Sequence, residues 1–313
     1  MILSICTDSL GNLAYEDMLD AVKGMGINYV EMTVGGWSPA PHIRVDELLG
    51  SEGKLAAFQK ALTDRGMGIA ALNCSGNPLD PGTLGEEHRV ALDKTLDLAK
   101  ALGVKKIVAM SGLPAGAPGD KVPNWITNTI NWTPLLREAV RYQWEDVAIP
   151  YWKKVVEKAK ECGVEKIALE NFPNMLVVNP ETVLKLREAV GPMIGMNLDP
   201  SHLMYLGADP IQSARALGDA IHHVHGKDTR IERGVADRNG LLENKGIEDI
   251  ANRSWNYVAV GCGKDLQWWK EFFSVVKMMG YNDFVSLEME DMTMSVEAGL
   301  KTSVDALKQT ISQ

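Results

Sequence analysis

Four side chains that can bind a metal ion follow apolar runs in the second half of the chain. Glu170 ends the run ALE, Asp199 ends MNLD, His225 ends HVH and Glu288 ends SLE. An apolar run with an abrupt polar stop is typical of a buried strand. Pro200 strengthens this reading, because proline cannot donate a hydrogen bond to a strand ladder. If these strands are parallel neighbours, the four side chains meet at one edge of the sheet.

Three carboxylates and one imidazole form a ligand set that suits a divalent cation. Oxygen ligands with one nitrogen favour Mn²⁺ or Mg²⁺, and they also fit Co²⁺ or Zn²⁺; we expect Mn²⁺ first. Carboxylates that share a cleft raise one another's pKa unless a positive charge lies between them. The alternative is that each residue is an ordinary polar end to its strand. Four consecutive strands that end in this way favour the metal site.

A recurring sequence pattern predicts the strands and helices that position these residues. An amphipathic stretch ends, a glycine follows, and an apolar run begins at once. Glycine at the end of a helix takes up the left-handed conformation that other residues adopt only at a cost. The pattern occurs at Gly26, Gly66, Gly103, Gly163, Gly191, Gly218 and Gly280. Together with the opening run 2–6, these junctions predict eight strands that alternate with helices.

Short turns into the strands and helical crossovers out of them predict parallel strands. Eight such units predict an α/β fold, a closed (β/α)₈ TIM barrel formed by one domain over residues 1–313. An open doubly wound sheet is the alternative, and no GxGxxG motif supports its dinucleotide-binding version. Three long connections, 33–51, 111–141 and 227–265, are then expected on the C-terminal rim. Their tryptophans and histidine are expected to form ordered pocket walls.

Several further residues are candidates for substrate contact. His202 lies three residues after Asp199, and Lys227 lies two residues after His225, where an ammonium could stabilise an oxyanion. A helix-cap histidine and a solvated rim lysine are the alternatives. The remaining candidates on the rim are Trp37, His42, Trp125 and Asn73.

Strand parity separates the other histidines of the seventh strand. His223 shares the parity of His225 and is expected to point into the barrel, whereas His222 should face the helices. Glu31 is expected to end the second strand and to orient substrate. Glu290 follows the eighth strand and is expected to be a supporting or loop charge.

Composition narrows the classes of function. The chain has 313 residues, of which 45% are apolar, and a net charge of -9. Nucleic-acid binders usually have a basic face, and no Lys/Arg cluster stands out here. Four scattered cysteines without a CxxC motif argue against a zinc-finger or disulfide framework. No leader and no apolar run of about 18 residues is visible, so we expect a cytoplasmic protein that binds neither membranes nor nucleic acid.

At this point the sequence resembles the xylose isomerase-like TIM barrels over essentially its whole length. The motifs are ALENFP at Glu170, NLDPSHL at Asp199 and His202, HVHGKD at His225 and SLEMED at Glu288. That superfamily includes sugar phosphate isomerases and epimerases, ketose 3-epimerases, inosose dehydratases and, more distantly, DNA-repair enzymes of the endonuclease IV type. The stretches that resemble the branch labelled sugar phosphate isomerase/epimerase are ALNCSGNPLDPG, PNWITN, RYQWEDVAIPYW and RSWNYVAVGCGKD.

The resemblance implies a metal-dependent isomerase or epimerase of a sugar or keto-sugar, phosphorylated or not. A divalent ion holds two substrate oxygens, one carboxylate removes the proton beside the carbonyl, and a second returns it to the enediolate. Glu170 and Glu288 are then both metal ligands and acid–base residues. The chain departs from the branch where histidine is frequent, at Asp80, Phe172, Lys264 and Met289. These changes leave the four ligands intact and the substrate open.

A lyase is the main alternative, with the same proton abstraction followed by loss of a β-leaving group. Inosose dehydratases work in this way, as do C-glycoside deglycosidase subunits, which act on 3-keto-glycosides with a smaller partner subunit. Either reading implies a small carbohydrate substrate and leaves open a homo-oligomer or a smaller partner subunit. DNA repair is disfavoured, because that enzyme type uses three zinc ions and many histidines and this acidic chain has six histidines. A structural metal in a non-catalytic binding protein is the remaining alternative.

Overall fold

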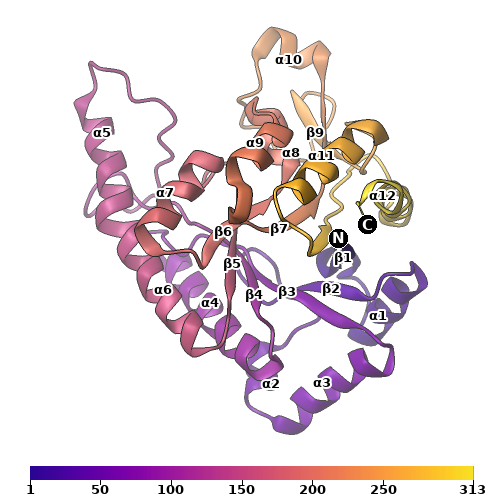
Figure 1. Ribbon diagram of the computed structural model, residues 1–313. Helices are drawn as coiled ribbons and strands as arrows, with labels where there is room; N and C mark the ends of the chain where they lie inside the picture. The colour runs from indigo at the N-terminus through magenta and orange to yellow at the C-terminus, as the bar shows by residue number, and fades with distance from the viewer. Residues whose placement is uncertain (313) are drawn as a thin grey trace. The chain divides into compact units, whose positions relative to one another are not determined.

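The computed structural model describes residues 1–312 (Figure 1), and its sheet confirms the predicted barrel. Eight parallel strands close in the order β1, β10, β7, β6, β5, β4, β3, β2. Their bounds are β1 Ile2–Cys6, β2 Tyr29–Thr33, β3 Gly68–Cys74, β4 Lys106–Met110, β5 Lys166–Glu170, β6 Ile194–Leu198, β7 Ile221–Gly226 and β10 Phe284–Leu287. The chain therefore has the α/β, (β/α)₈ architecture that the glycine junctions predict.

Gly103 has the predicted left-handed cap conformation, whereas Gly191 and Gly218 have ψ angles of 170° and -122°, outside it. The seven junction glycines nevertheless share one property. Their φ angles are positive, from +53° at Gly218 to +121° at Gly191. A side chain would be strained in this left-handed region, so glycine lets each helix end and the chain turn directly into the next strand.

The helices alternate with the strands along the chain, as expected. Their bounds are α1 Tyr15–Gly24, α2 Val45–Leu49, α3 Glu52–Asp64, α4 Thr83–Leu102, α5 Pro134–Arg141, α6 Ile149–Glu161, α7 Pro180–Val190, α8 Pro200–Leu206, α9 Pro210–Leu217, α10 Arg233–Asn239, α11 Leu266–Met278 and α12 Val296–Thr310. Three other helical segments are η1 Thr7–Leu10, the π-helical η2 Tyr142–Ala148 and η3 Gly218–Ala220. Within residues 1–312, none of these helices is both long and apolar enough to cross a membrane.

The three long connections contain more regular structure than the sequence indicates. The connection 33–51 includes α2, and 111–141 is shorter than predicted because α5 already begins at Pro134. The connection 227–265 contains α10 and the strands β8 Asp228–Ile231 and β9 Trp255–Val258, which pair antiparallel. These strands were missed because 23 residues separate them (231 to 255) and no tight turn signals the pairing.

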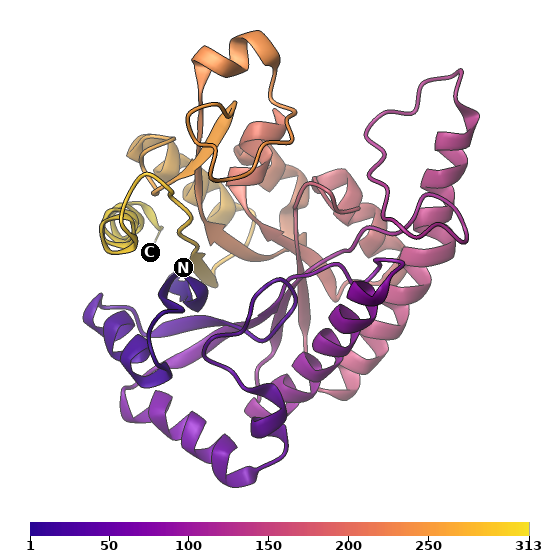
Figure 2. The ribbon, with the colours of Figure 1, turned by 180° about the vertical axis from the view of Figure 1, so that it is seen from behind.

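Two compact units make up the chain. The first contains residues 1–31, 61–70 and Asn197 onward, and the second contains residues 32–60 and 71–196. In the first unit α11 packs against α9 and α12, and in the second α6 packs against α4 and α7 (Figures 1 and 2). The single domain over residues 1–313 stays a prediction.

Candidate metal centre and active site

Three of the predicted ligands converge in the first unit. Asp199 follows β6, His225 is the penultimate residue of β7, and Glu288 follows β10. Nδ1 of His225 lies 3.7 Å from Oδ2 of Asp199 and 3.3 Å from Oε2 of Glu288. The ligand atoms of the three residues all lie within 4.8 Å of one another. One cation that binds each atom at roughly 2.0–2.5 Å can span these separations.

The start of helix α8 fixes the carboxylate of Asp199. Pro200 occupies the first helical position, and Oδ1 of Asp199 accepts the N–H of Ser201 at 2.8 Å. This cap uses one carboxylate oxygen. The other, Oδ2, faces His225 and lies 3.3 Å from Nε2 of His202. The proline that ends β6 thus also directs a carboxylate oxygen toward the histidines.

His202 is buried and contacts two tyrosine hydroxyls. Its Nδ1 lies 3.1 Å from the hydroxyl of Tyr205 and 3.0 Å from that of Tyr257, and the hydroxyls are 3.3 Å apart. Tyr205 belongs to α8 and Tyr257 to β9. Trp255 stacks on Tyr205 with 3.6 Å between ring centroids. A continuous set of polar and aromatic contacts therefore links Asp199 to the inserted strand β9.

Lys227 is buried, so the alternative of a solvated rim lysine is wrong. Its side chain is 3% exposed, and Nζ lies 3.0 Å from Oε2 of Glu288 and 2.6 Å from Oε2 of Glu290. Nζ also lies 4.2 Å from the centroid of the Tyr257 ring, in a cation–π contact. The sequence therefore places a fixed positive charge directly beside one of the predicted ligands.

The charges around the cluster keep its carboxylates ionised. Burial raises the pKa of Glu288, but the Lys227 ammonium and His225 together outweigh it, and the pKa falls to about 2. Burial likewise raises the pKa of Asp199, and the positive groups that face it, His202 first, hold that pKa below its usual range. Burial lowers the pKa of Lys227, whereas Glu288 and Glu290 raise it well above its usual value. Ionised carboxylates are the form that binds cations.

Glu31 lies in the middle of β2, so the prediction that it ends this strand is wrong. It is fully buried. Its Oε2 lies 2.7 Å from Nε2 of His223, and its Oε1 lies 3.2 Å from Nε2 of His225. His223 therefore points into the barrel, as strand parity predicts. The apolar Met32 that follows Glu31 could have indicated that the strand continues.

The other predicted site residues belong to the second unit. Glu170 is the last residue of β5, as predicted, and it is 3% exposed. Asn73 is the penultimate residue of β3, and its Oδ1 accepts the N–H of Ser75 at 2.9 Å. This bond makes Asn73 a turn residue, and its contact with substrate stays a prediction.

The aromatic residues of the long connections differ in exposure. Trp37 is 52% exposed and packs edge-on against His88, with 4.7 Å between ring centroids. His42 is buried, Trp125 is half-buried, and Trp132 is 78% exposed. Trp132 is thus a surface residue here. Substrate contact by Trp37, His42 and Trp125 stays a prediction.

Tyr205 and Tyr257 were not predicted as site residues. Tyr205 lies three residues after His202, a spacing at which helical side chains face one another, so a signal was present. Tyr257 lies 55 residues from His202 in the chain. Because it belongs to a strand that the sequence did not indicate, no spacing rule connects it to the site.

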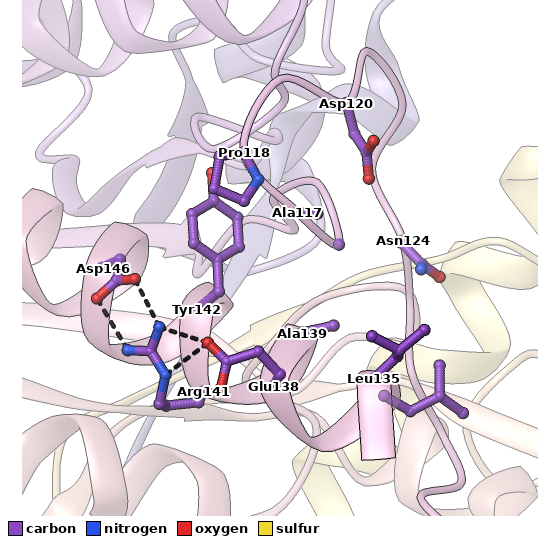
Figure 3. A pocket seen from close by; sticks show the side chains of 12 residues that line it. Ala117, Pro118, Asp120, Asn124, Leu135, Glu138, Ala139, Arg141, Tyr142 and Asp146 are labelled. Carbon is purple, nitrogen blue, oxygen red and sulfur yellow. Dashed lines mark hydrogen bonds and ion pairs between the residues drawn. The ribbon is translucent and has the colours of Figure 1, made fainter. Parts of the chain in front are cut away.

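A separate pocket of about 350 Å³ lies in the second unit (Figure 3). It is lined by Gly116, Ala117, Pro118, Asp120, Asn124, Leu135, Leu136, Glu138, Ala139, Arg141, Tyr142 and Asp146. Arg141 pairs with Glu138 at 2.7 Å and with Asp146 at 3.0 Å. None of the predicted ligands or substrate contacts is among these lining residues. With two of its three carboxylates paired to Arg141, the pocket does not present a cation site.

Comparison with known proteins agrees with this geometry. The sequence model of the xylose isomerase-like TIM barrels matches residues 19–310. The chain belongs to the xylose isomerase-like TIM barrel family. The strand-end residues Asp199, His225 and Glu288 thus belong to a xylose isomerase-like barrel.

Relatives of this xylose isomerase-like barrel include one of high identity. "Uncharacterized protein YfiH" of Bacillus subtilis (strain 168) is 68% identical over 313 residues, which are 100% of both chains. Among solved structures, the IOLI protein with a binding zinc atom is 22% identical, with a TM-score of 0.68 over 100% of both chains. The probable 3-DHS dehydratase AsbF of Bacillus anthracis is 20% identical, with a TM-score of 0.67 over 98% of this chain and 99% of that one.

A D-tagatose 3-epimerase-like protein is also similar in structure. It is 15% identical, with a TM-score of 0.64 over 98% of this chain and 97% of that one. At these low identities, the likeness to the solved structures shows the shared fold alone.

The donor set of this xylose isomerase-like barrel fits a divalent cation. Asp199 and Glu288 bring two ionised carboxylates to one imidazole nitrogen of His225. Asp199 and His225 are almost completely buried, so water screens these charges poorly. Hard oxygen donors with one imidazole are the ligands that Mn²⁺, Mg²⁺, Co²⁺ and Zn²⁺ take in proteins.

Proposed function

We propose that the protein is a metal-dependent isomerase or epimerase of a small sugar or keto-sugar, phosphorylated or not. The observation that carries this proposal is the convergence of Asp199, His225 and Glu288 within 4.8 Å, beside the buried ammonium of Lys227. All four lie at the carboxyl ends of barrel strands, where TIM-barrel enzymes bind their substrates. Cation ligands next to a separate fixed ammonium suit a substrate that carries several oxygens.

We propose Glu170 as the fourth ligand. It is buried at the carboxyl end of β5, which neighbours β6 in the barrel order, and parallel strands end on the same rim. Its carboxylate completes a set of three acidic residues and one histidine, for which we propose Mn²⁺, with Mg²⁺, Co²⁺ and Zn²⁺ as alternatives. The zinc atom named for the similar IOLI structure supports a divalent ion.

The chain's own carboxylates supply the proton transfer. Bound at these ligands, a divalent ion would polarise a substrate carbonyl. Glu170 and Glu288 flank Asp199 and His225 in strand order. One of the two glutamates, as the carboxylate, removes the proton beside the carbonyl, and the other, as the carboxylic acid, donates its own proton to a different atom or face of the enediolate.

Lys227 assists this proton transfer through the enediolate oxygen and through the pKa of Glu288. Its Nζ lies 3.0 Å from Oε2 of Glu288, close enough to stabilise an enediolate oxygen that forms beside that glutamate. When the Lys227 ammonium turns to the substrate oxygen, its ion pair with the Glu288 carboxylate weakens. The pKa of Glu288 then rises from about 2, and the carboxylate becomes a better base.

A lyase is the second candidate, and the pairing of His202 with Tyr257 favours it. Loss of a β-leaving group requires a proton donor for the departing oxygen. The hydroxyl of Tyr257, 3.0 Å from Nδ1 of His202, lies in a buried network that reaches Asp199. Such a lyase would resemble an inosose dehydratase or a C-glycoside deglycosidase subunit. The dehydratase name of the similar AsbF structure supports it.

One experiment in D₂O separates the two functions. The Mn²⁺-loaded protein is incubated with a panel of aldoses, ketoses and 3-keto-glycosides, and products are analysed by NMR and mass spectrometry. Deuterium in a product of unchanged formula supports the isomerase, whereas release of water or an aglycone supports the lyase. Failure to bind Mn²⁺, with no turnover of any substrate, refutes both.

Variants test the assigned glutamates in the same assay. Glu170→Gln and Glu288→Gln should lower kcat by about 100-fold or more. Glu297→Gln, a substitution of an exposed glutamate in the first turn of α12, should keep full activity. A Glu170→Gln enzyme that binds metal and keeps full activity would remove the role assigned to Glu170.

The remaining features of this proposal concern partners and location. The net charge of -9 favours a small carbohydrate ligand over nucleic acid. We further propose a cytoplasmic location and an assembly as a homo-oligomer or with a smaller partner subunit. Gel filtration with light scattering tests the assembly.

A further inference from the structure

A buried polar column lies inside the barrel on the side of His225 that faces away from Asp199 and Glu288. Its members come from strands of the first unit: Ser4, Glu31, Asn197, His223, His225 and Ser286. The hydroxyls of Ser4 and Ser286 are 2.8 Å apart, and Oγ of Ser286 lies 2.9 Å from Nε2 of His223. The column therefore continues from the metal-ligand cluster into the barrel.

The two ring nitrogens of His225 face different partners. Nδ1 faces Asp199 and Glu288, at 3.7 and 3.3 Å. Nε2 faces Glu31, whose two carboxylate oxygens lie 3.2 and 3.3 Å away. An imidazole coordinates through a nitrogen that carries no proton, and the acceptor on its other nitrogen decides which tautomer forms. The acceptor on Nε2 thus determines whether Nδ1 can bind a cation.

Glu31 is itself held in a defined position. Oε2 accepts from Nε2 of His223 at 2.7 Å, and the side chains of both residues are completely buried. A carboxylate without exposed surface is costly, and apolar residues of similar volume often stabilise a core as well or better. A buried glutamate that contacts two imidazoles is therefore better explained by what it does to the histidines than by stability.

We propose that Glu31 is a positioning residue of the metal centre, which accepts the Nε2 proton of His225 and thereby turns the lone pair of Nδ1 toward the cation. His223 supports this role by fixing the Glu31 carboxylate. The inference rests on the proposed function, because it assumes a cation at Asp199, His225 and Glu288. It assigns to β2 and to the interior of the barrel a part in cation affinity.

The amide of Asn197 competes for the same ring nitrogen. Its Nδ2 lies 3.1 Å from Nε2 of His225, so an amide in this orientation favours a proton on Nδ1 instead. Turning the amide over would present its oxygen to the Nε2 proton. The position of the proton therefore decides between the two arrangements and can be measured directly.

NMR of the protein with ¹⁵N-labelled histidine and bound Zn²⁺, which is diamagnetic, shows which ring nitrogen of His225 carries the proton. We expect a protonated Nε2 and a metal-bound Nδ1 for His225 in the wild type, and an altered Nε2 proton signal in Glu31→Gln. A proton on Nδ1, or coordination through Nε2, overturns the proposal. If wild-type protein binds neither Zn²⁺ nor Mn²⁺, the proposed function is wrong. If it binds the cation with a different tautomer of His225, only the role of Glu31 is wrong.

Calorimetric titration with Mn²⁺ and Zn²⁺ supplies a second readout that does not depend on activity. Glu31→Gln should weaken cation affinity by about 10- to 100-fold, and His223→Gln should weaken it by less. The matched control is Ser4→Ala, which removes a buried polar group of the same column three contacts away from Glu31. If Glu31→Gln fails to fold, the cation affinity of His223→Gln and the His225 tautomer of the wild type test the proposal instead. Wild-type affinity in either foldable variant overturns the role of the residue replaced.

Discussion

Lys227 controls the charge of the candidate site at the scale of single residues. It is the buried cation that contacts both Glu288 and Glu290, and it lies against the ring of Tyr257. An ammonium that is 3% exposed interacts more strongly with neighbouring charges than one in water. The low pKa of Glu288 depends on this proximity, and so does the pH range in which Glu288 is an ionised ligand.

Replacement of Lys227 by methionine should raise the pH below which Mn²⁺ affinity is lost, which is the acid limb of the affinity profile. Burial raises the pKa of Glu288, and Lys227 is the main group that lowers it to about 2. Without the ammonium this pKa rises, so protonation competes with the cation at a higher pH. The same low pKa stabilises the fold above the unfolded value of 4.5, and this stability is lost as pH falls toward 2.

Titration calorimetry from pH 4 to pH 8 measures this shift. The matched control is Lys245→Met, because Lys245 pairs with Glu243 at 3.0 Å and is not a partner of Glu288. An acid limb at the same pH in Lys227→Met and in the wild type would contradict the assigned cause.

Residue-scale prediction succeeded where a side chain ends a strand. Asp199, His225 and Glu288 could be predicted to converge, because parallel strands deliver their last residues to one rim. Glu31 could not be placed in this way: it interrupts an apolar strand in the middle, and its partners are 192 and 194 residues away in the sequence. A charged residue inside an otherwise apolar run was the available signal.

At the scale of elements, Asp228 fastens the insertion formed by β8, α10 and β9 to the barrel. Its carboxylate is fully buried and accepts five hydrogen bonds: from the backbone N–H of Thr229, Gly261, Gly263 and Lys264 and from Nε1 of Trp269. Gly263 allows this approach, because an added Cβ would lie 2.5 Å from Oδ1 of Asp228. The two ends of the insertion are thus joined at one carboxylate.

Asp228→Asn should destabilise the protein by about 3 kcal/mol, since the amide replaces one acceptor oxygen by a donor that faces other donors. Urea unfolding measures the change, and limited proteolysis between residues 232 and 254 should become faster. Asp237→Asn is the control: Asp237 is exposed on α10 and pairs with Arg233, so its loss should change stability by at most about 0.5 kcal/mol. Equal stability of Asp228→Asn and the wild type would refute the anchoring role.

Element-scale prediction depended on local signals. The seven helix–glycine–strand junctions announce their strands because glycine is needed at the point where the helix ends. The insertion carries no such signal, since its strands pair over a long connection that includes α10. Tyr257 and its contact with His202 were missed for this reason.

At the scale of the whole molecule, barrel closure brings together the two ends of the chain. β1 pairs with β10, with Ile2 opposite Phe284. The Met1 ammonium donates to Oδ1 of Asn282 at 2.9 Å and to the carbonyl oxygen of Ser312 at 2.8 Å. The eight-strand count predicted from sequence requires this pairing of first and last strands, although the terminal hydrogen bonds could not be predicted.

A circular permutant tests whether closure, and not the order of the strands along the chain, specifies the fold. A short Gly/Ser linker joins residue 313 to residue 1, and new ends are made between Gly119 and Asp120, in an exposed turn after β4. Because exposed turns tolerate new ends, Tm should fall by less than about 5 °C, and Mn²⁺ affinity should be retained. A matched permutant opened between His222 and His223, inside β7, should not fold, because the cut divides a barrel strand that carries a proposed ligand. Circular dichroism, thermal melting and calorimetry measure both proteins, and equal behaviour of the two would show that the barrel does not depend on intact strands.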